Sequence, residues 1–256
     1  MKAKERLDKI IVDRGIVKSR ERAKALIMAG SVLVDNQTAA KAGMLVSVDA
    51  HVALKEKDIP YVSRGGVKLE AALAGFAVDP FGKIVMDIGC STGGFTDCVL
   101  KKGAVKVYAV DVGYGQLDWS LRNDPRVTVH EKTNIRHLEK ASIRDAVDLI
   151  VIDVSFISLT QVLPRVHDFL RDGGDVIALV KPQFEVGREM IEKGGIVRDE
   201  TKRLTAVNKI REFSEASGLV VMGLCDSPIP GQKGNREYFI HLRRKDHGRA
   251  QGTHRA

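Results

Sequence analysis

The first 54 residues combine two helical patterns with short apolar runs. Segments 5–14 and 19–29 place apolar residues at helical spacing, and Gly15 and Gly30 follow their ends. Short apolar runs predict strands at 32–34, 45–48 and 51–54. Two helices leading into a small sheet predict a compact α+β domain over residues 1–58.

A charged stretch with a proline, residues 59–65, predicts a linker because periodicity is lost there. Beyond it, helical patterns are expected at 66–74, 94–101, 116–121, 157–169 and 200–217. Almost continuously apolar runs predict strands at 83–87, 105–110, 127–130, 147–152, 175–180, 219–225 and 237–242. Strands of this kind are buried on both faces, so residues 66–245 are predicted to form a doubly wound α/β sheet. Residues 182–198 lack periodicity and are a candidate lid or substrate loop.

The net charge of +8 is concentrated at the two ends of the chain. Residues 1–60 carry +4 and residues 241–256 carry +4, whereas the segment between them is neutral. This separation favours a polyanion that the ends hold and the middle modifies. A solvated charged surface is the alternative interpretation of this charge pattern. Residues 246–256 are predicted to be a basic tail.

The composition favours a reducing compartment. No secretory signal or membrane-length apolar run is seen, and the 3 cysteines form no C-x-x-C pair. A cytoplasmic protein with neither a disulfide framework nor a metal site is therefore expected, and Cys90 is expected to be a packing residue. The oligomeric state is not implied.

A glycine-rich turn, residues 89–94, follows the apolar run that ends in Asp87. A second apolar run ends in Asp111, where an acid suits the hydroxyl pair of a ribose. The turn reads G-x-x-x-G-G, which disfavours an NAD dehydrogenase, and Asp87 would repel a pyrophosphate. S-adenosylmethionine, a nucleoside without phosphates, fits better. An ordinary strand–turn–helix corner is the alternative interpretation.

Two more charged residues, Asp153 and Lys181, directly follow predicted strands. Ligands of such sheets bind outside the carboxyl ends of the strands, so Lys181 is a candidate general base. The alternative is a purely structural salt bridge to Asp153. Neither the proline-rich clamp of enzymes that methylate base nitrogens nor a suitably placed cysteine is present. A hydroxyl, and in particular the ribose 2′-OH that distinguishes RNA, is the expected acceptor.

Several motifs resemble known families. Leu7-Asp8-Lys9, Ser19-Arg20-x-x-Ala23 and Gly30-x-Val32-x-Val34 resemble the S4 RNA-binding domain. The chain also resembles the TlyA family of ribosomal RNA 2′-O-methyltransferases, which have an FtsJ-like domain and are often labelled hemolysin-like. The motifs that carry this second resemblance are Val62-Ser-Arg-Gly-Gly-x-Lys68-Leu, Asp87-Ile-Gly-Cys-Ser-Thr-Gly-Gly-Phe-Thr, Asp153-Val-Ser-Phe-Ile-Ser and Val180-Lys-Pro-Gln-Phe-Glu.

The resemblance implies a catalytic tetrad of Lys68, Asp153, Lys181 and Glu237. Lys181 would accept or orient the 2′-OH proton, the two acids would fix Lys181, and Lys68 would support the developing oxyanion. The implied cofactor is S-adenosylmethionine, with binding residues Asp87, Gly89, Ser91, Thr92, Gly93, Gly94, Phe95, Asp111 and Asn134. Asn134 could equally be a helix cap. The RNA-binding candidates are Arg6, Lys9, Lys18, Arg20, Arg22, Lys24, Lys41 and Arg64.

The implied substrate is a cytidine of ribosomal RNA, either in free RNA or in a ribosomal subunit. The large subunit is favoured, because the chain begins only a few residues before its S4-like helix, and the small subunit is possible. A non-catalytic RNA-binding protein and, less expected, a membrane-active hemolysin are the competing interpretations.

Overall fold

The computed structural model describes residues 3–17, 19–28, 30–55 and 59–245. The candidate RNA-binding residue Lys18 and the basic tail therefore lie outside the described residues. The chain divides into two compact units, residues 1–60 and 61–256.

The first unit contains two helices and two small sheets. Its elements are β1 (Lys4–Arg6), α1 (Leu7–Asp13), α2 (Arg20–Met28), β2 (Val32–Val34), β3 (Gln37–Thr38), β4 (Leu45–Ser47) and β5 (Val52–Leu54). The strands form an antiparallel β1–β4 pair and a sheet of order β3-β2-β5. Leu7, Ile11 and Ile27 are buried in its core. The sequence did not predict β1 or β3, because both are very short and polar and owe their form to their partner strands.

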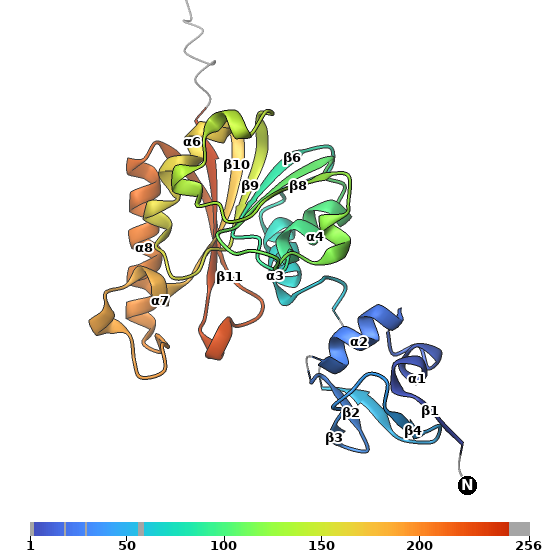
Figure 1. Ribbon diagram of the computed structural model, residues 1–256. Coiled ribbons are helices and arrows are strands. Elements are labelled where there is room, and N and C mark those ends of the chain that lie inside the picture. Colours follow the sequence, from blue (N-terminus) through green and yellow to red (C-terminus); the bar gives the residue numbers. More distant parts are fainter. Residues whose placement is uncertain (1–2, 18, 29, 56–58, 246–256) are drawn as a thin grey trace, which may run out of the picture. The chain divides into compact units, whose positions relative to one another are not determined.

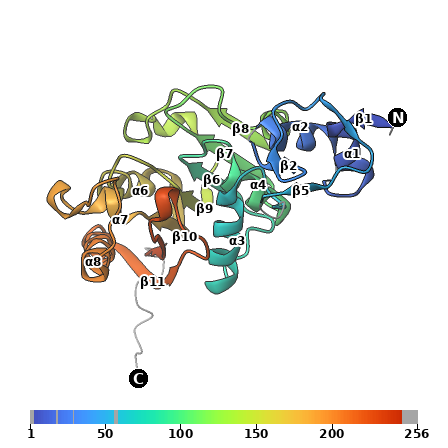
Figure 2. The same cartoon turned by 90° about the horizontal axis from the view of Figure 1, so that it is seen from below.

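The second unit is built on a seven-stranded sheet of order β11-β12-β10-β9-β6-β7-β8. Its strands are β6 (Ile84–Ile88), β7 (Lys106–Val110), β8 (Val127–His130), β9 (Val147–Ile152), β10 (Leu170–Val180), β11 (Leu219–Asp226) and β12 (Tyr238–Arg244). Strand β12 runs antiparallel to both of its neighbours, β10 and β11, and the other strand pairs described for this sheet are parallel. The predicted doubly wound α/β sheet is confirmed (Figures 1 and 2).

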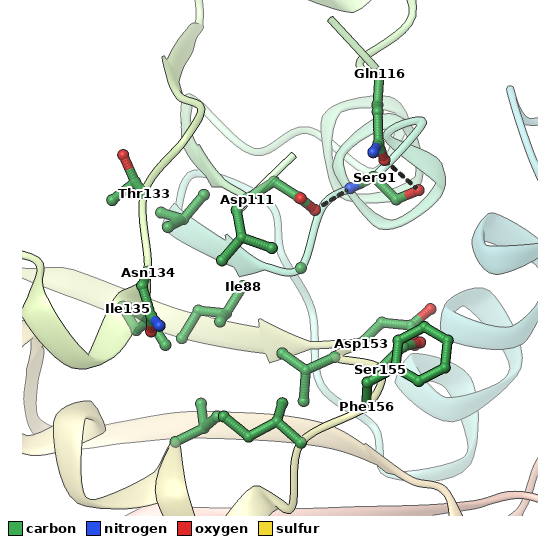
Figure 3. Close-up of a pocket in the computed structure, with 16 residues that line it drawn as sticks. Ile88, Ser91, Asp111, Gln116, Thr133, Asn134, Ile135, Asp153, Ser155 and Phe156 are labelled. Atoms are coloured by element: carbon green, nitrogen blue, oxygen red, sulfur yellow. Dashed lines mark hydrogen bonds between the residues drawn. The ribbon is translucent and has the colours of Figure 1, made fainter. Parts of the chain in front are cut away.

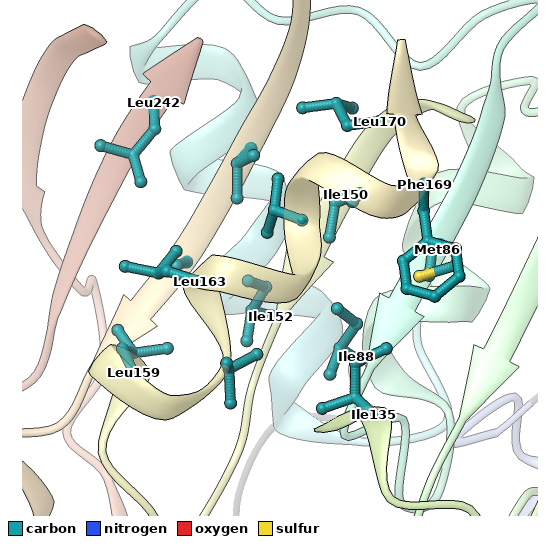
Figure 4. Close-up of a cluster of buried hydrophobic side chains, with 14 of the residues drawn as sticks. Met86, Ile88, Ile135, Ile150, Ile152, Leu159, Leu163, Phe169, Leu170 and Leu242 are labelled. Atoms are coloured by element: carbon teal, nitrogen blue, oxygen red, sulfur yellow. The ribbon is translucent and has the colours of Figure 1, made fainter. Parts of the chain in front are cut away.

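Helices cover both faces of this sheet. One face packs against α8 (Glu200–Ala216) and the segment that precedes β10. Figure 4 shows Leu159, Leu163 and Phe169 of that segment packed over the strand residues Met86 and Ile150. The other face packs against α3 (Arg64–Gly75), α4 (Gly94–Lys101) and α5 (Trp119–Arg122). The apolar runs that predicted the strands are the positions buried between these layers.

The segment 157–169 was predicted as one helix, and this prediction is wrong. The structure has two 3-10 turns, η3 (Leu159–Gln161) and η4 (Leu163–Arg165), and the short helix α6 (Val166–Phe169). Pro164 has no N–H to donate and interrupts the helical ladder. Strand β10 begins at Leu170, five residues earlier than expected, with a register shift before Asp175.

Two further segments differ in detail. Helix α3 begins at Arg64, inside the predicted linker. The candidate lid, residues 182–198, contains α7 (Pro182–Glu185), the 3-10 turn η5 (Arg188–Met190) and an antiparallel bridge between Glu192 and Ile196.

Candidate active site

The carboxyl ends of four parallel strands meet at one edge of the sheet and place the candidate residues there. Gly89 follows β6, Asp111 follows β7, Asp153 follows β9 and Lys181 follows β10. These strands are neighbours in the order β10-β9-β6-β7, so the four positions lie along one edge. This is the edge at which ligands of open α/β sheets bind.

The glycine turn needs glycine at two positions for steric reasons. Gly89 has φ +84°, and a Cβ there would lie 2.5 Å from the carbonyl oxygen of Asp153. Gly93 has φ +94°, and its Cβ would lie 2.3 Å from the side chain of Leu121. Glycine adopts such a backbone at little cost and allows these close approaches. The turn therefore lies directly against the loop after β9.

Asp111 joins the glycine turn to the loop after β7. Its Oδ2 accepts a hydrogen bond from the backbone N–H of Ser91 at 2.8 Å, and its Oδ1 accepts one from Gly113 at 2.7 Å. Figure 3 shows Asp111 and Ser91 joined in this way, with the Ser91 hydroxyl turned to Gln116. Each carboxylate oxygen has a further lone pair, so Asp111 can still accept hydrogen bonds from a ligand hydroxyl pair.

A cavity of about 320 Å³ opens beside Asp111. Its lining is mostly apolar, with Ile88, Val110 and Ile135 among its walls, and Asn134 at its edge (Figure 3). Asn134 Oδ1 accepts a hydrogen bond from the backbone N–H of Arg136 at 3.1 Å, so this residue caps the turn that follows it and also lines the cavity. The size and mixed lining suit a nucleoside.

A second cavity of about 420 Å³ contains all four residues of the predicted tetrad. Lys68, Asp153, Lys181 and Glu237 line it together with Arg64 and the glycine turn. The two cavities share Gly89, Ser91, Asp153, Ser155 and Phe156. The two cavities therefore adjoin each other at these residues.

Lys181 lies close to the loop after β9. Its ammonium nitrogen is 2.6 Å from Oδ1 of Asp153 and donates a hydrogen bond to the Ser155 hydroxyl at 2.9 Å. The side chain is 11% exposed, so it lies against the cavity wall rather than in solvent. The salt bridge considered from the sequence exists, and it forms inside the cavity.

Lys68 and Glu237 form the other pair of the tetrad. Lys68 Nζ donates to Glu237 Oε2 at 2.5 Å, and both side chains are buried. In the structure Glu237 thus pairs with Lys68, whereas the acid paired with Lys181 is Asp153. Lys68 on α3 occupies the space beside Glu237, while Asp153 and Lys181 follow the adjacent strands β9 and β10. Gly231 makes room for this pair, since a Cβ there would lie 1.9 Å from Glu237 Oε1.

The predicted cofactor residues fall into two groups. Gly89, Ser91 and Asp111 line one or both cavities, as do Thr92, Gly94, Phe95 and Asn134. Asp87 and Gly93 lie behind the cavity walls and line neither of them. Asp87 is fully buried, and its Oδ2 accepts a hydrogen bond from the Thr96 hydroxyl at 2.7 Å.

Burial raises the pKa of the Asp87 carboxyl to about 7. The pKa of this carboxyl is higher in the folded protein than in the unfolded protein, where it is about 4. Its contribution to the free energy of unfolding is therefore fully present below about pH 4 and is lost as the pH rises to 7. The variant Asp87→Asn keeps an acceptor for Thr96 but cannot ionise. Its free energy of unfolding, relative to that of the unsubstituted protein, should therefore rise by about 2–3 kcal/mol as the pH is raised from 5 to 8. Urea unfolding at both pH values measures this difference, and a difference independent of pH would contradict it.

The sequence reasoning missed several cavity residues. Phe156 is 90% exposed, has φ +65° and lines both cavities. Its ring lies 5.1 Å from that of Phe184, which lines the second cavity. Ser155, Gln116 and Gln183 also line the cavities. The DVSFIS and KPQFE motifs contain four of these five residues and were the available signal.

The described basic candidates of the first unit are exposed or half-buried, and several are ion-paired. Asp8 is buried, and its carboxylate receives hydrogen bonds from Arg6 at 2.9 and 3.0 Å and from Arg20 at 3.0 Å. These bonds hold the pKa of Asp8 well below its usual range. Lys9 pairs with Glu5. Lys24 and Lys41 are exposed, Arg22 is half-buried, and Arg64 belongs to the second unit, where it is exposed and lines the second cavity.

The described residues contain no group of three or more His, Cys, Asp or Glu residues able to hold a metal ion. None of their helices is long and apolar enough to cross a membrane.

Comparison with known proteins agrees with this geometry. The chain matches the FtsJ-like methyltransferase family over residues 61–244 and the S4 domain over residues 5–52. YqxC of Bacillus subtilis (strain 168) is 48% identical over 240 residues, which are 93% of this chain and 85% of that protein. A second relative is the 16S/23S rRNA (cytidine-2′-O)-methyltransferase TlyA of Mycobacterium tuberculosis (strain ATCC 25618 / H37Rv). It is 45% identical over 244 residues, which are 95% of this chain and 91% of that protein.

A solved structure from Streptococcus thermophilus, named as a hemolysin, has a TM-score of 0.75 and 44% sequence identity. The match covers 96% of this chain and 90% of that one. The chain therefore belongs to the TlyA family, and it is an FtsJ-like, S-adenosylmethionine-dependent methyltransferase with an S4 domain.

Proposed function

We propose that this enzyme methylates the 2′-hydroxyl of a cytidine in ribosomal RNA. The observation that carries the proposal is the cavity in which Lys68, Asp153, Lys181 and Glu237 meet beside the nucleoside-sized cavity at Asp111. The M. tuberculosis relative is named for the same reaction on 16S and 23S rRNA. A substrate of this kind is consistent with the expected cytoplasmic location.

The residues present fit S-adenosylmethionine. Asp111 offers carboxylate oxygens to a ribose, and Asn134 offers an amide at the far edge of the apolar cavity. Gly89 and Ser91 belong to both cavities and would hold the part of the cofactor between them. When bound, the cofactor supplies a methyl group on a positively charged sulfur.

Lys181 is the group proposed to act on the ribose hydroxyl. Its ammonium nitrogen is held by Asp153 and Ser155 at the boundary of the two cavities. From there it would orient the 2′-OH, and its neutral amine form would accept the hydroxyl proton and become the ammonium as the oxygen gains its methyl group. Positioning supplies much of the rate enhancement in such transfers, because the reacting atoms must be close and aligned.

Lys68 is proposed to stabilise negative charge on the ribose oxygen. Its pairing with buried Glu237 fixes the ammonium group in the second cavity. Phe156 and Phe184 present aromatic rings at this cavity, and aromatic side chains stack on unpaired bases. These two residues would hold the target cytosine once it has left its helix.

RNA binding is expected to be strongly salt-dependent. The S4 domain carries Arg20, Lys24 and Lys41 on its surface, and such groups bind phosphates and release counterions. With about four phosphate contacts, affinity should fall roughly 50–150-fold between 50 and 200 mM salt. Filter binding with labelled rRNA over this range measures the slope. An affinity that does not change with salt would contradict a phosphate-binding role.

The test of the proposed function uses ribosomal subunits from cells that lack this protein. The purified protein and S-adenosylmethionine are added to each subunit and to its free RNA, and ribose methylation is mapped. A new 2′-O-methylcytidine supports the proposal and also identifies the subunit, the large one being expected. The absence of a new ribose methyl group in all four substrates would contradict the proposal.

A membrane-active hemolysin has less support. The name of the S. thermophilus structure is the observation in its favour. Neither cavity favours such an activity, since polar groups that line them, among them Asp111, Asp153 and Lys181, fit the proposed methyl transfer. Leakage from vesicles caused by pure protein without cofactor would be the result that favours it.

A further inference from the structure

The last residues of two sequence motifs meet in the structure. Ser158 ends the DVSFIS motif and Glu185 ends the KPQFE motif. The Ser158 hydroxyl donates to Glu185 Oε2 at 2.5 Å, and the backbone N–H of Leu159 donates to Glu185 Oε1 at 2.8 Å. Both oxygens of one carboxylate are thus used to hold the loop that follows β9.

The other side of this contact is anchored to the long helix α8. Lys209 on α8 donates to the backbone carbonyl of Glu185 at 2.6 Å, and its ammonium nitrogen lies 3.9 Å from Glu185 Oε2. Glu185 is the last residue of α7, and Lys181 immediately precedes that helix. The Glu185 carboxylate therefore connects the turn that carries Lys181 to the loop that carries Asp153.

Glu185 is buried at a cost that its local bonds must offset. Only 4% of the residue is exposed, and burial raises the pKa of its carboxyl. A buried carboxyl is unfavourable unless its oxygens are hydrogen-bonded. The groups facing it are Ser158, Leu159 and Lys209, none of which belongs to the tetrad.

The loop that Glu185 holds contains a strained residue. Phe156 has φ +65°, a conformation that is costly for a bulky side chain and persists only where the surroundings enforce it. The loop is fastened to α7 at two places, by the contact of Phe156 with Phe184 and by the bonds to Glu185. Between these points and β9 lie Asp153 and Ser155, the two partners of Lys181.

We propose that Glu185 is a positioning residue, which fastens the 153–158 loop to α7 and thereby sets the geometry of Lys181 and Asp153. This inference rests on the proposed function for its effect on rate. The fastening itself is independent of any activity and can be measured separately.

The test compares Glu185→Ala and Glu185→Gln with the unsubstituted protein. Glu185→Ala should lower kcat roughly 10–100-fold, as is typical for a group that orients a catalytic residue, and should change cofactor affinity much less. Glu185→Gln keeps an acceptor for Leu159 and should restore most of kcat. Exchange of the Leu159 amide hydrogen should accelerate at least about 10-fold in the alanine variant and much less in the glutamine variant.

A matched control is Asp175→Asn, which disturbs another buried acid. Asp175 lies in β10, five residues before the end of the strand, and is bonded to His241 and Arg243. This variant should lose stability but keep kcat. An equal loss of kcat in the control, or full kcat in Glu185→Ala, would overturn the inference.

The fastening can still be tested if Glu185→Ala does not fold or if the protein shows no activity on RNA. If Glu185→Ala does not fold, Ser158→Ala takes its place, since it removes one of the two loop bonds, and a normal kcat together with normal Leu159 exchange would refute the fastening. If the unsubstituted protein transfers no methyl group to RNA, the proposed function fails, and Leu159 exchange alone then tests the fastening. Unchanged exchange in Glu185→Ala would overturn it, and faster exchange would support it.

Discussion

Lys181→Ala should lower the rate of methyl transfer to RNA by about 10²–10⁴-fold, the range expected when a group that takes a proton is removed. Binding of S-adenosylmethionine should change by less than about threefold, because Lys181 lines only the second cavity and not the one beside Asp111. Single-turnover kinetics give the rate, and calorimetry gives the cofactor affinity.

A surface lysine serves as the control for this experiment. Lys140→Ala removes the same charge from an exposed position in a 3-10 turn that lines neither cavity. It should leave the rate and cofactor affinity unchanged. If Lys181→Ala kept the full rate, the role assigned to this amine would be wrong.

Gly89→Ala should abolish cofactor binding at micromolar concentration and destabilise the fold by several kcal/mol. The new Cβ would lie 2.5 Å from the carbonyl oxygen and 2.9 Å from the carbonyl carbon of Asp153. Backbone atoms at that distance cannot move aside as the end of a flexible side chain can. The substitution must therefore separate the glycine turn from the loop after β9, and both cavities include that boundary.

Gly218→Ala is the control that distinguishes the clash of a new Cβ with Asp153 from the strain of a positive φ angle. Gly218 has φ +83°, almost the value of Gly89, and a Cβ there meets nothing within 4 Å. It should cost only the strain of the left-handed region, about 1–2 kcal/mol, and leave cofactor binding intact. Thermal unfolding and calorimetry of the two variants compare them directly. Equal effects would mean that the contact with Asp153 is unimportant.

The sheet and the edge that carries the site could be predicted from the sequence. Asp111 and Lys181 each follow a run of apolar residues, and parallel strands bring such residues to one edge. This pattern is local in the sequence, so it can be recognised without knowledge of tertiary contacts. Pro164 was also visible in the sequence, and it shows why a helical period alone was not enough to predict residues 157–169 correctly.

The pairing within the site could not be predicted in the same way. Lys68 and Glu237 are 169 residues apart, and neither follows an apolar strand. Only the family resemblance indicated them, and it did not indicate that they pair with each other. The contact of Gly231 with Glu237 depends on the course of a loop, which periodicity does not describe.

Lys181 is proposed to act on a ribose 2′-OH. This role is tested most directly with an RNA substrate that carries 2′-deoxycytidine at the mapped position, assayed beside the same RNA with cytidine. We expect equal binding of the two RNAs and methyl transfer to the cytidine RNA alone. Transfer of a methyl group to the deoxycytidine RNA at a comparable rate would place the reaction on the base and contradict the proposed role of Lys181.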